Sequence, residues 1–187
     1  PRHPYPETKV QDAENLADVL SAFRGERIEP YVLLMAGCGL RLSEACGLNW
    51  EDIDFENLIV NVARTFHRTD RVSYFAPTKT TRSKALVSVP PMVAKRLAEI
   101  MESKVAAPED ALAPTRGKHG RIYSSYAWRL YRNVWERKGI GVEFVTLKNL
   151  RHTHATILKE SGADVADIAT TEAPPRYAPL VQLFEHT

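Results

Sequence analysis

The stretch "EPYVLLMAGCGLRLSEACGL", residues 29–48, decides the fold of this chain. The part before Arg41 is apolar on nearly every side, which predicts a helix inside the core that ends at the Gly37 and Gly39 pair. A short helix is expected to follow over residues 41–48. Arg41 is the one permanently charged side chain next to this apolar run. Because a guanidinium beside a core needs a partner or a ligand, Arg41 is the first candidate functional residue.

The composition predicts one globular domain without an obvious polyanionic partner. The chain has 187 residues, of which 44% are hydrophobic and 26% charged, enough for a single sizeable core. Lys and Arg number 25 against 23 acidic residues, so the net charge of +2 neither demands nor excludes nucleic acid as a partner. Any anion site must therefore be a local arrangement of cations.

Cysteine usage and hydropathy indicate a cytoplasmic protein. Cys38 and Cys46 both lie in apolar sequence, which favours reduced packing thiols over a disulfide framework. No apolar run is long enough to span a membrane, and no secretory signal opens the chain. We therefore expect no membrane partner. The chain starts at Pro1 rather than at a methionine, which suggests a fragment of a longer protein.

The periodicity of the remaining sequence predicts an α+β fold that is mainly α. Apolar residues recur at helical spacing, and helices are expected over residues 9–23, 91–104, 124–139 and 146–162. Alternating and β-branched patterns predict strands over residues 56–68, 71–77 and 84–90, with a turn near residues 77–83. The expected architecture is a helical domain with a small three-stranded antiparallel sheet.

Further cations lie beside the predicted core. Lys148 and Arg151 are three residues apart and project from the face next to the buried stripe of the last helix. Lys79 falls at the tip of the predicted hairpin, where a long ammonium can reach over a site. Each also has an ordinary interpretation: Arg41 can form a helix-surface ion pair with Glu44, and Lys79 can be a solvated turn residue.

If these cations converge, they form a clamp for a phosphate. Guanidinium groups bond two oxygens at once and keep their charge at neutral pH, so such a clamp would work without a metal ion. His152 and His154 are two residues apart and point in different directions on a helix, which argues against a metal pair. We interpret His152 as a local hydrogen-bonding group and His154 as core. No phosphate-binding glycine loop is present, so no nucleotide cofactor is expected.

Three sequence boxes, in order, resemble the catalytic domain of the tyrosine recombinases, the phage integrase family. "GCGLRLSEACGLNWEDIDFENLIVNV", residues 37–62, resembles the first arginine box of the family with its Trp-x-Asp-Ile-Asp turn and strand. "PTKTTRSKALVSVP", residues 77–90, is similar to the hairpin that carries the family lysine. "TLKNLRHTHATILKESGADVADI", residues 146–168, resembles the second box, usually His-x-x-Arg. The resemblance covers about residues 7–168.

The resemblance implies a role for each matching residue. Arg41 and Arg151 would clamp the scissile phosphate, and Lys79 would protonate the departing 5′ oxygen. Glu44 stands where an acidic residue supports the first arginine. Lys148 stands where histidine is usual, which keeps a phosphate donor but makes a poorer proton shuttle, because the ordinary pKa of lysine is far above that of histidine. The catalytic set implied is Arg41, Lys79, Lys148 and Arg151, with no metal and no cofactor.

The family pattern is lost after Ile168. The family would continue with a Leu-Gly-His box and a segment that carries the nucleophilic tyrosine, and residues 169–187 match neither. Tyr177 is closer to Arg151 than the family interval, and prolines surround it. It can be read as the nucleophile or as a tail tyrosine. We expect one catalytic domain over residues 1–187 with an atypical tail, and a core-binding domain upstream of it.

The function implied by the resemblance is site-specific DNA recombination, either integration or excision. A tyrosine would attack a phosphodiester of double-stranded DNA and form a 3′-phosphotyrosyl link, with four protomers assembled on two duplexes. The alternative is a catalytically incomplete DNA-binding remnant that regulates a full-length recombinase. Further phosphate contacts are expected from basic side chains, each of which can also be an ordinary solvated residue. These are Arg64, Arg68, Lys118, Arg129, Arg132 and Arg137.

Overall fold

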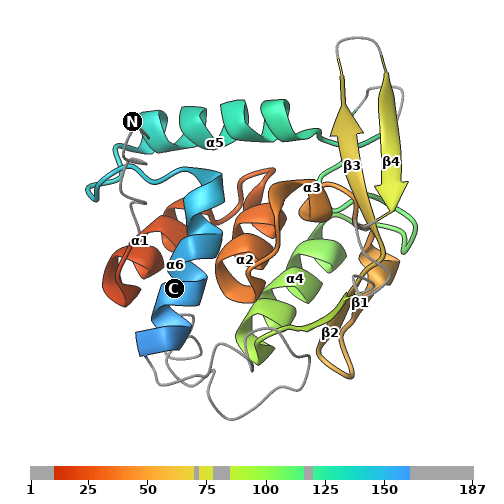
Figure 1. Ribbon diagram of the computed structural model, residues 1–187, viewed down its shortest axis with the longest axis horizontal. Helices are drawn as coiled ribbons and strands as arrows, with labels where there is room; N and C mark the ends of the chain where they lie inside the picture. Colours follow the sequence, from red (N-terminus) through yellow and green to blue (C-terminus); the bar gives the residue numbers. More distant parts are fainter. Residues whose placement is uncertain (1–10, 70–71, 78–84, 116–119, 161–187) are drawn as a thin grey trace, which may run out of the picture.

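Helices form most of the described protein. The structure is a computed structural model, and it describes residues 11–69, 72–77, 85–115 and 120–160 (Figure 1). The helices in these ranges are α1 (Ala13–Phe23), α2 (Glu29–Cys38), α3 (Leu42–Ala45), α4 (Pro91–Ser103), α5 (Ser124–Lys138) and α6 (Leu147–Glu160), with a 3₁₀ turn η1 (Trp50–Asp52). Every helix that the sequence predicts is present, and the mainly α class is confirmed.

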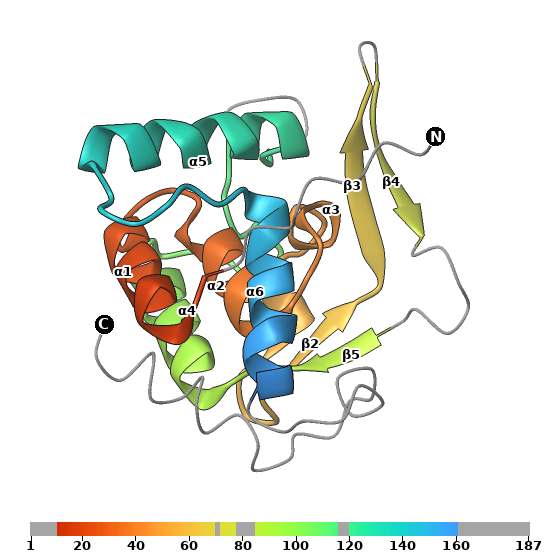
Figure 2. The same cartoon turned by 60° about the vertical axis from the view of Figure 1, so that its left-hand side comes forward.

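Helix α2 is the centre of the core. All of its residues are buried, as expected for a segment that is apolar on every side. Helices α1, α3, α4 and α6 all pack against it (Figure 2). The elements that carry the candidate cations, α3 and α6, therefore rest on one common support.

The end of α2 fixes how closely α6 approaches. Gly39 ends the helix in the left-handed conformation at φ 66°, and a Cβ atom there would lie 2.8 Å from Cδ2 of His154 on α6. His154 is buried, and its Nδ1 lies 3.0 Å from the carbonyl oxygen of Ala36. The prediction that His154 belongs to the core is confirmed.

The strands form two small sheets rather than one. A three-stranded antiparallel sheet exists, with strand order β1-β2-β5, but its strands are not the three that the sequence predicted. Residues 53–54 supply the third strand, whereas residues 73–77, predicted to belong to it, form β4 and pair with β3 in a separate two-stranded ribbon. The strands are β1 (Ile53–Asp54), β2 (Ile59–Val62), β3 (Arg64–Arg68), β4 (Ser73–Pro77) and β5 (Ala85–Ser88). Val60 faces Val87 in the sheet, and Phe66 faces Phe75 in the ribbon.

The single strand predicted over residues 56–68 is therefore wrong in one respect, because it is two strands that belong to different sheets. The break falls at Ala63, whose N–H donates to the carbonyl oxygen of Asn61 at 3.2 Å. The next side chain, Arg64, donates to the carbonyl oxygen of Gly47 at 2.9 Å and to Asp52 at 2.7 Å. These contacts draw β3 toward the segment after α3, and β2 continues in its own sheet.

Side-chain caps set the starts of two helices. Helix α1 begins later than predicted, because Asp12 accepts a hydrogen bond from the N–H of Asn15 at 2.8 Å and so acts as its N-cap. At α6 the Thr146 hydroxyl accepts from the N–H of Asn149 at 3.3 Å, and the predicted capping role is confirmed. This cap places Lys148 in the first turn of α6.

The two cysteines are buried and free, as the sequence predicted. Burial raises the pKa of both thiols, that of Cys46 to about 12, so they are protonated packing groups at neutral pH. Within the described ranges, none of the helices combines the length and the apolar character needed to traverse a bilayer.

Candidate active site

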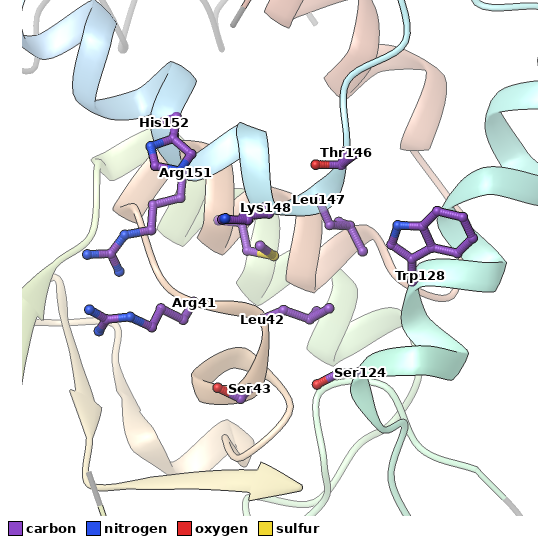
Figure 3. A pocket seen from close by; sticks show the side chains of 11 residues that line it. Arg41, Leu42, Ser43, Ser124, Trp128, Thr146, Leu147, Lys148, Arg151 and His152 are labelled. Atoms are coloured by element: carbon purple, nitrogen blue, oxygen red, sulfur yellow. The ribbon is translucent and has the colours of Figure 1, made fainter. Parts of the chain in front are cut away.

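A pocket of about 820 Å³ opens between α3, α5 and α6 (Figure 3). Its walls come from three segments that are far apart in the sequence, and the buried end of α2 lies beneath them. Four of the side chains that line it carry or can carry positive charge. The lining residues are Met35, Arg41, Leu42, Ser43, Ser124, Trp128, Thr146, Leu147, Lys148, Arg151 and His152.

Arg41 is held at the entrance to α3 by one carboxylate. Its backbone N–H donates to Oε2 of Glu44 at 2.6 Å, and its guanidinium donates to Oε1 of the same residue at 2.8 Å. The Arg41 side chain is 65% exposed, whereas that of Glu44 is only 12% exposed. The ion pair expected from the ordinary interpretation therefore forms, and the Arg41 side chain remains largely exposed and lines the pocket.

Arg151 approaches the same carboxylate from the opposite wall. A guanidinium nitrogen of Arg151 lies 3.9 Å from Oε2 of Glu44, and the Arg151 side chain is 40% exposed. Burial, and then the positive charge of Arg41, keep the pKa of Arg151 below its ordinary value, while Glu44 raises it. In Figure 3 the Arg41 and Arg151 side chains extend in the same direction from facing walls. Glu44 thus links two cations that would otherwise repel each other.

Lys148 and His152 line the same pocket from α6, and both are exposed. The structure thus brings Arg41, Lys148 and Arg151 to one pocket, and Arg41 and Arg151 share Glu44. Such a set of donors matches the oxygens of a phosphate group, because guanidinium forks contact two oxygens and an ammonium supplies a point charge. Among the residues that the structure describes, His, Cys, Asp and Glu side chains form no cluster of three that could hold a metal ion.

Other predicted site residues fall elsewhere. Lys79, Lys118 and Tyr177 lie outside the described residues. Arg64 is not a free surface cation, because its guanidinium is bound to Asp52 and to the Gly47 carbonyl. The remaining predicted phosphate contacts are exposed and have neighbours of their own. These are Arg68 over the Tyr123 ring, Arg129 over the Tyr126 ring, Arg132 paired with Glu136, and Arg137 paired with Glu26.

The sequence reasoning missed the wall that α5 contributes. Trp128 and Ser124 line the pocket from this helix, whose other aromatic residues, Tyr131 and Trp135, are buried. No signal for this role was present in the sequence, because Trp128 is three residues from Tyr131 and seven from Trp135 and therefore shares a helix face with these buried residues. An exposed tryptophan beside cations is typical of a binding surface.

Comparison with known proteins shows which family has sequences similar to this chain. Residues 8–171 match the sequence profile of the phage integrase family. The chain is 28% identical over 159 residues to the tyrosine recombinase XerA of Thermococcus kodakarensis, covering 84% of this chain and 50% of that protein. It is 29% identical over 183 residues to the integrase of Mycobacterium phage D29, covering 92% of this chain and 48% of that protein.

The fold has solved counterparts. The Tn1549 transposon integrase in complex with circular intermediate DNA superposes with a TM-score of 0.73 at 18% identity, covering 88% of this chain and 58% of that one. The chain spans about half the length of the curated relatives it matches. Because the family profile covers most of the sequence, and the arginine boxes meet in one pocket, the chain belongs to the phage integrase family.

Proposed function

We propose that this chain is the part of a tyrosine recombinase that cleaves and rejoins DNA at specific sites. The observation that carries the proposal is the pair Arg41 and Arg151, which share Glu44 and line one pocket from opposite walls. This arrangement supports binding of a phosphodiester rather than a neutral ligand. Family membership supplies the class of reaction, the breaking and rejoining of DNA strands.

In this proposal, Arg41 and Arg151 bind the non-bridging oxygens of the scissile phosphate. Their charge offsets the negative charge that grows on the phosphorus in the transition state, and the low exposure of Glu44 keeps the pair in position before DNA arrives. Glu44 is a positioning residue, because it acts through the two guanidinium groups. Lys148 adds a third donor from the first turn of α6.

The chemical step exchanges one ester for another. A tyrosine oxygen bonds to phosphorus and passes its proton to a water molecule, while the bond from phosphorus to the 5′ oxygen breaks and that oxygen takes a proton from Lys79. Reversal by the 5′ hydroxyl of another strand rejoins the DNA, so the bond energy is conserved and no nucleotide cofactor or metal is required. Tyr177 remains the candidate nucleophile within this chain.

The partner that we propose is double-stranded DNA. Four copies of the chain would assemble on two duplexes, and the reaction would take place in the cytoplasm. The exposed side chains of Arg129 and Arg132 on α5, a helix that also lines the pocket, support contacts to phosphates next to it. That the Tn1549 integrase is described in complex with circular intermediate DNA is in keeping with this partner. We further propose that residues 1–187 act as one catalytic domain.

The experiment that tests the proposal captures the covalent intermediate. The chain is incubated with a pool of nicked duplexes of random sequence, in which cleavage beside the nick releases a short fragment and traps the protein on DNA. We expect an adduct that survives denaturation, a common motif among the recovered sequences, and no adduct from the double variant Arg41→Ala with Arg151→Ala.

Two further results decide between the alternatives. Loss of the adduct in Tyr177→Phe, with DNA binding retained, would assign the nucleophile to this chain. DNA binding by the unaltered chain without an adduct under any condition would contradict the cleavage proposal and favour the non-cleaving regulator.

A further inference from the structure

Two arginines on β3 and α5 differ from the other arginines of these elements in what holds them. Arg68 is the last residue of β3, Arg129 lies in the second turn of α5, and both are exposed. Among the residues that the structure describes, neither guanidinium makes a hydrogen bond or an ion pair. The other arginines of the two elements are each bound to a carboxylate: Arg64 to Asp52, Arg132 to Glu136 and Arg137 to Glu26.

A tyrosine ring holds each of the two arginines. The Cζ atom of Arg68 lies 4.3 Å from the centre of the Tyr123 ring, and that of Arg129 lies 4.9 Å from the centre of the Tyr126 ring. Both distances are within the range of cation–π attraction. A tyrosine ring carries no net charge, so it attracts a cation without neutralising it, whereas a carboxylate does both. Arg68 and Arg129 therefore keep their charge and their N–H donors for an anion.

The two rings form a single support that is anchored in the fold. The ring centroids of Tyr123 and Tyr126 are 5.9 Å apart, and both side chains pack partly buried against the hydrophobic core. Tyr123 is the N-cap residue of α5, and its carbonyl oxygen accepts the N–H of Tyr126 at 3.0 Å. The start of α5 lies next to β3 (Figures 1 and 2). The rings thus connect cations from two elements that are far apart in the sequence.

This support lies next to the pocket. Ser124, which lines the pocket, directly follows Tyr123, and Trp128, which also lines it, directly precedes Arg129. A DNA strand carries a phosphate on every nucleotide, so a strand whose scissile phosphate is held in the pocket presents further phosphates to the surface around it. A guanidinium without a carboxylate partner suits such a phosphate, because its fork of donors matches two phosphate oxygens.

We infer that Arg68 and Arg129 bind phosphates of the DNA backbone beside the one held in the pocket, and that Tyr123 and Tyr126 are positioning residues that hold the two guanidinium groups ready for this contact. The inference rests on the proposed function, because the pocket determines where the strand lies. It also ranks Arg68 and Arg129 above the arginines whose charge a carboxylate already offsets.

The test measures the affinity for DNA as a function of salt concentration. A fluorescein-labelled pool of duplexes of random sequence is titrated with the chain between about 50 and about 200 mM NaCl, and binding is followed by fluorescence anisotropy. The variants are Arg68→Gln and Arg129→Gln. Arg137→Gln is the matched control, because it removes the same charge from α5 at a guanidinium that Glu26 already binds at 2.7 Å.

We expect each of Arg68→Gln and Arg129→Gln to weaken binding about fivefold and to make the slope of log affinity against log salt shallower by about 0.9, because each loses one phosphate contact. Arg137→Gln should change the affinity less than about twofold and leave the slope unchanged. Its former partner Glu26 keeps Lys138, whose Nζ lies 3.1 Å from the carboxylate.

The tyrosines are tested by variants that keep or remove the ring. Tyr123→Leu and Tyr126→Leu should weaken binding about threefold without changing the salt slope, because the arginine keeps its charge but is no longer held in position. Tyr123→Phe and Tyr126→Phe keep the ring and should bind like the unaltered chain. Thermal midpoints are measured for all variants, so that a loss of folded protein is not counted as a loss of binding.

Two results would overturn the inference. If Arg68→Gln or Arg129→Gln changes the slope no more than Arg137→Gln does, that arginine does not contact a phosphate. If the Phe variants bind like the Leu variants, the rings do not position the arginines. In both cases the proposed function stands as long as Arg41→Ala with Arg151→Ala abolishes the covalent adduct. If the unaltered chain binds the duplexes without any dependence on salt, the proposed function fails as well.

Discussion

Two pairs of arginines lie on either side of the segment that follows α3, and they differ in how their donors are used. Arg64 and Arg121 are bound within the fold: Arg121 donates to the carbonyl oxygens of Cys46 at 3.1 Å and Leu48 at 3.4 Å. It also donates to Oδ1 of Asn49 at 2.6 Å. Apart from Nε of Arg121, which is buried without a hydrogen-bond partner among the described residues, the donors of this pair are bound to backbone and side-chain acceptors, so the pair stabilises the loop.

Arg41 and Arg151 lie on the other side and share a single acceptor. Within the described residues, Glu44 is the acidic group that both contact, at 2.8 Å and 3.9 Å. Both side chains line the pocket, and their remaining N–H groups have no other acceptor among the residues that the structure describes. The comparison teaches that arginine content does not distinguish a binding site from a structural clamp, whereas the number of donors left without an acceptor does.

We call Arg41 and Arg151 the pocket pair, and Arg64 and Arg121 the structural pair. The largest expected effect is the loss of DNA cleavage when an arginine of the pocket pair is replaced. Arg151→Ala should lower the rate of adduct formation on the nicked duplex pool by about 10² to 10³, because one preorganised donor set for the transition-state charge is lost. Arg151→Lys keeps the charge but not the fork, and it should recover only part of the rate. The thermal midpoint should stay within a few degrees of that of the unaltered chain. A large drop in stability would mean that Arg151 belongs with the structural pair.

The reverse behaviour is expected of Arg121. Arg121→Ala should lower the free energy of unfolding by about 3 kcal/mol, because two carbonyl groups lose their donor and the Phe75 ring loses a cation 4.7 Å from its centre. Urea titration measures the loss. Arg132→Ala is the matched control, since its exposed pair with Glu136 should be worth less than about 1 kcal/mol. Equal losses in the two variants would contradict the comparison.

Acid should weaken the support behind the pocket pair. Burial lowers the pKa of His154 to about 4, below its ordinary 6.5, so in acid the unfolded chain binds a proton there that the native chain does not. The contribution of His154 to the free energy of unfolding is therefore fully present above pH 6.5 and is lost as the pH falls toward 4. The expected loss is about 2 kcal/mol between pH 7.5 and pH 5. In His154→Asn, urea titrations across this interval should show a shallower pH dependence, and an unchanged slope would contradict the assignment.

The smallest effect is expected from the carboxylate that the pocket pair shares. Glu44→Gln keeps an acceptor for the backbone N–H of Arg41 but removes the charge between the two guanidinium groups, so adduct formation should fall about tenfold. Glu44→Ala also removes a hydrogen bond at the start of α3 and should cost about 1 kcal/mol of stability in addition. An increase in rate in Glu44→Gln would show that Glu44 competes with the phosphate instead of positioning its binders.

Much of the fold follows from the sequence because its signals are local. The apolar run over residues 30–38 produces most of α2, Gly39 ends it, and Thr146 starts α6 as predicted. The break at Ala63 was not predictable in this way. It depends on Arg64 reaching Gly47 and Asp52, and contacts between distant segments leave no periodic trace in a strand pattern.

The site divides in the same manner. Arg41, Lys148 and Arg151 were found from charge placed beside apolar stripes and from the resemblance of their boxes to the family pattern. The sequence did not reveal that the guanidinium of Arg64 binds acceptors within the fold, because this depends on the tertiary contact of Arg64 with Gly47 and Asp52. It did not place Trp128 in the pocket either, since the orientation of α5 against α6 is a tertiary property.

The contact between Gly39 and His154 has a consequence for how the chain can change. A Cβ atom at residue 39 would lie 2.8 Å from the ring of His154, so a larger residue there must displace that side chain, and His154 is on the same helix as Arg151. A residue outside the pocket lining thus constrains how α6, which carries Arg151, packs against the end of α2. A search for variants with altered binding should therefore randomise Gly39 and His154 as well as the residues that line the pocket.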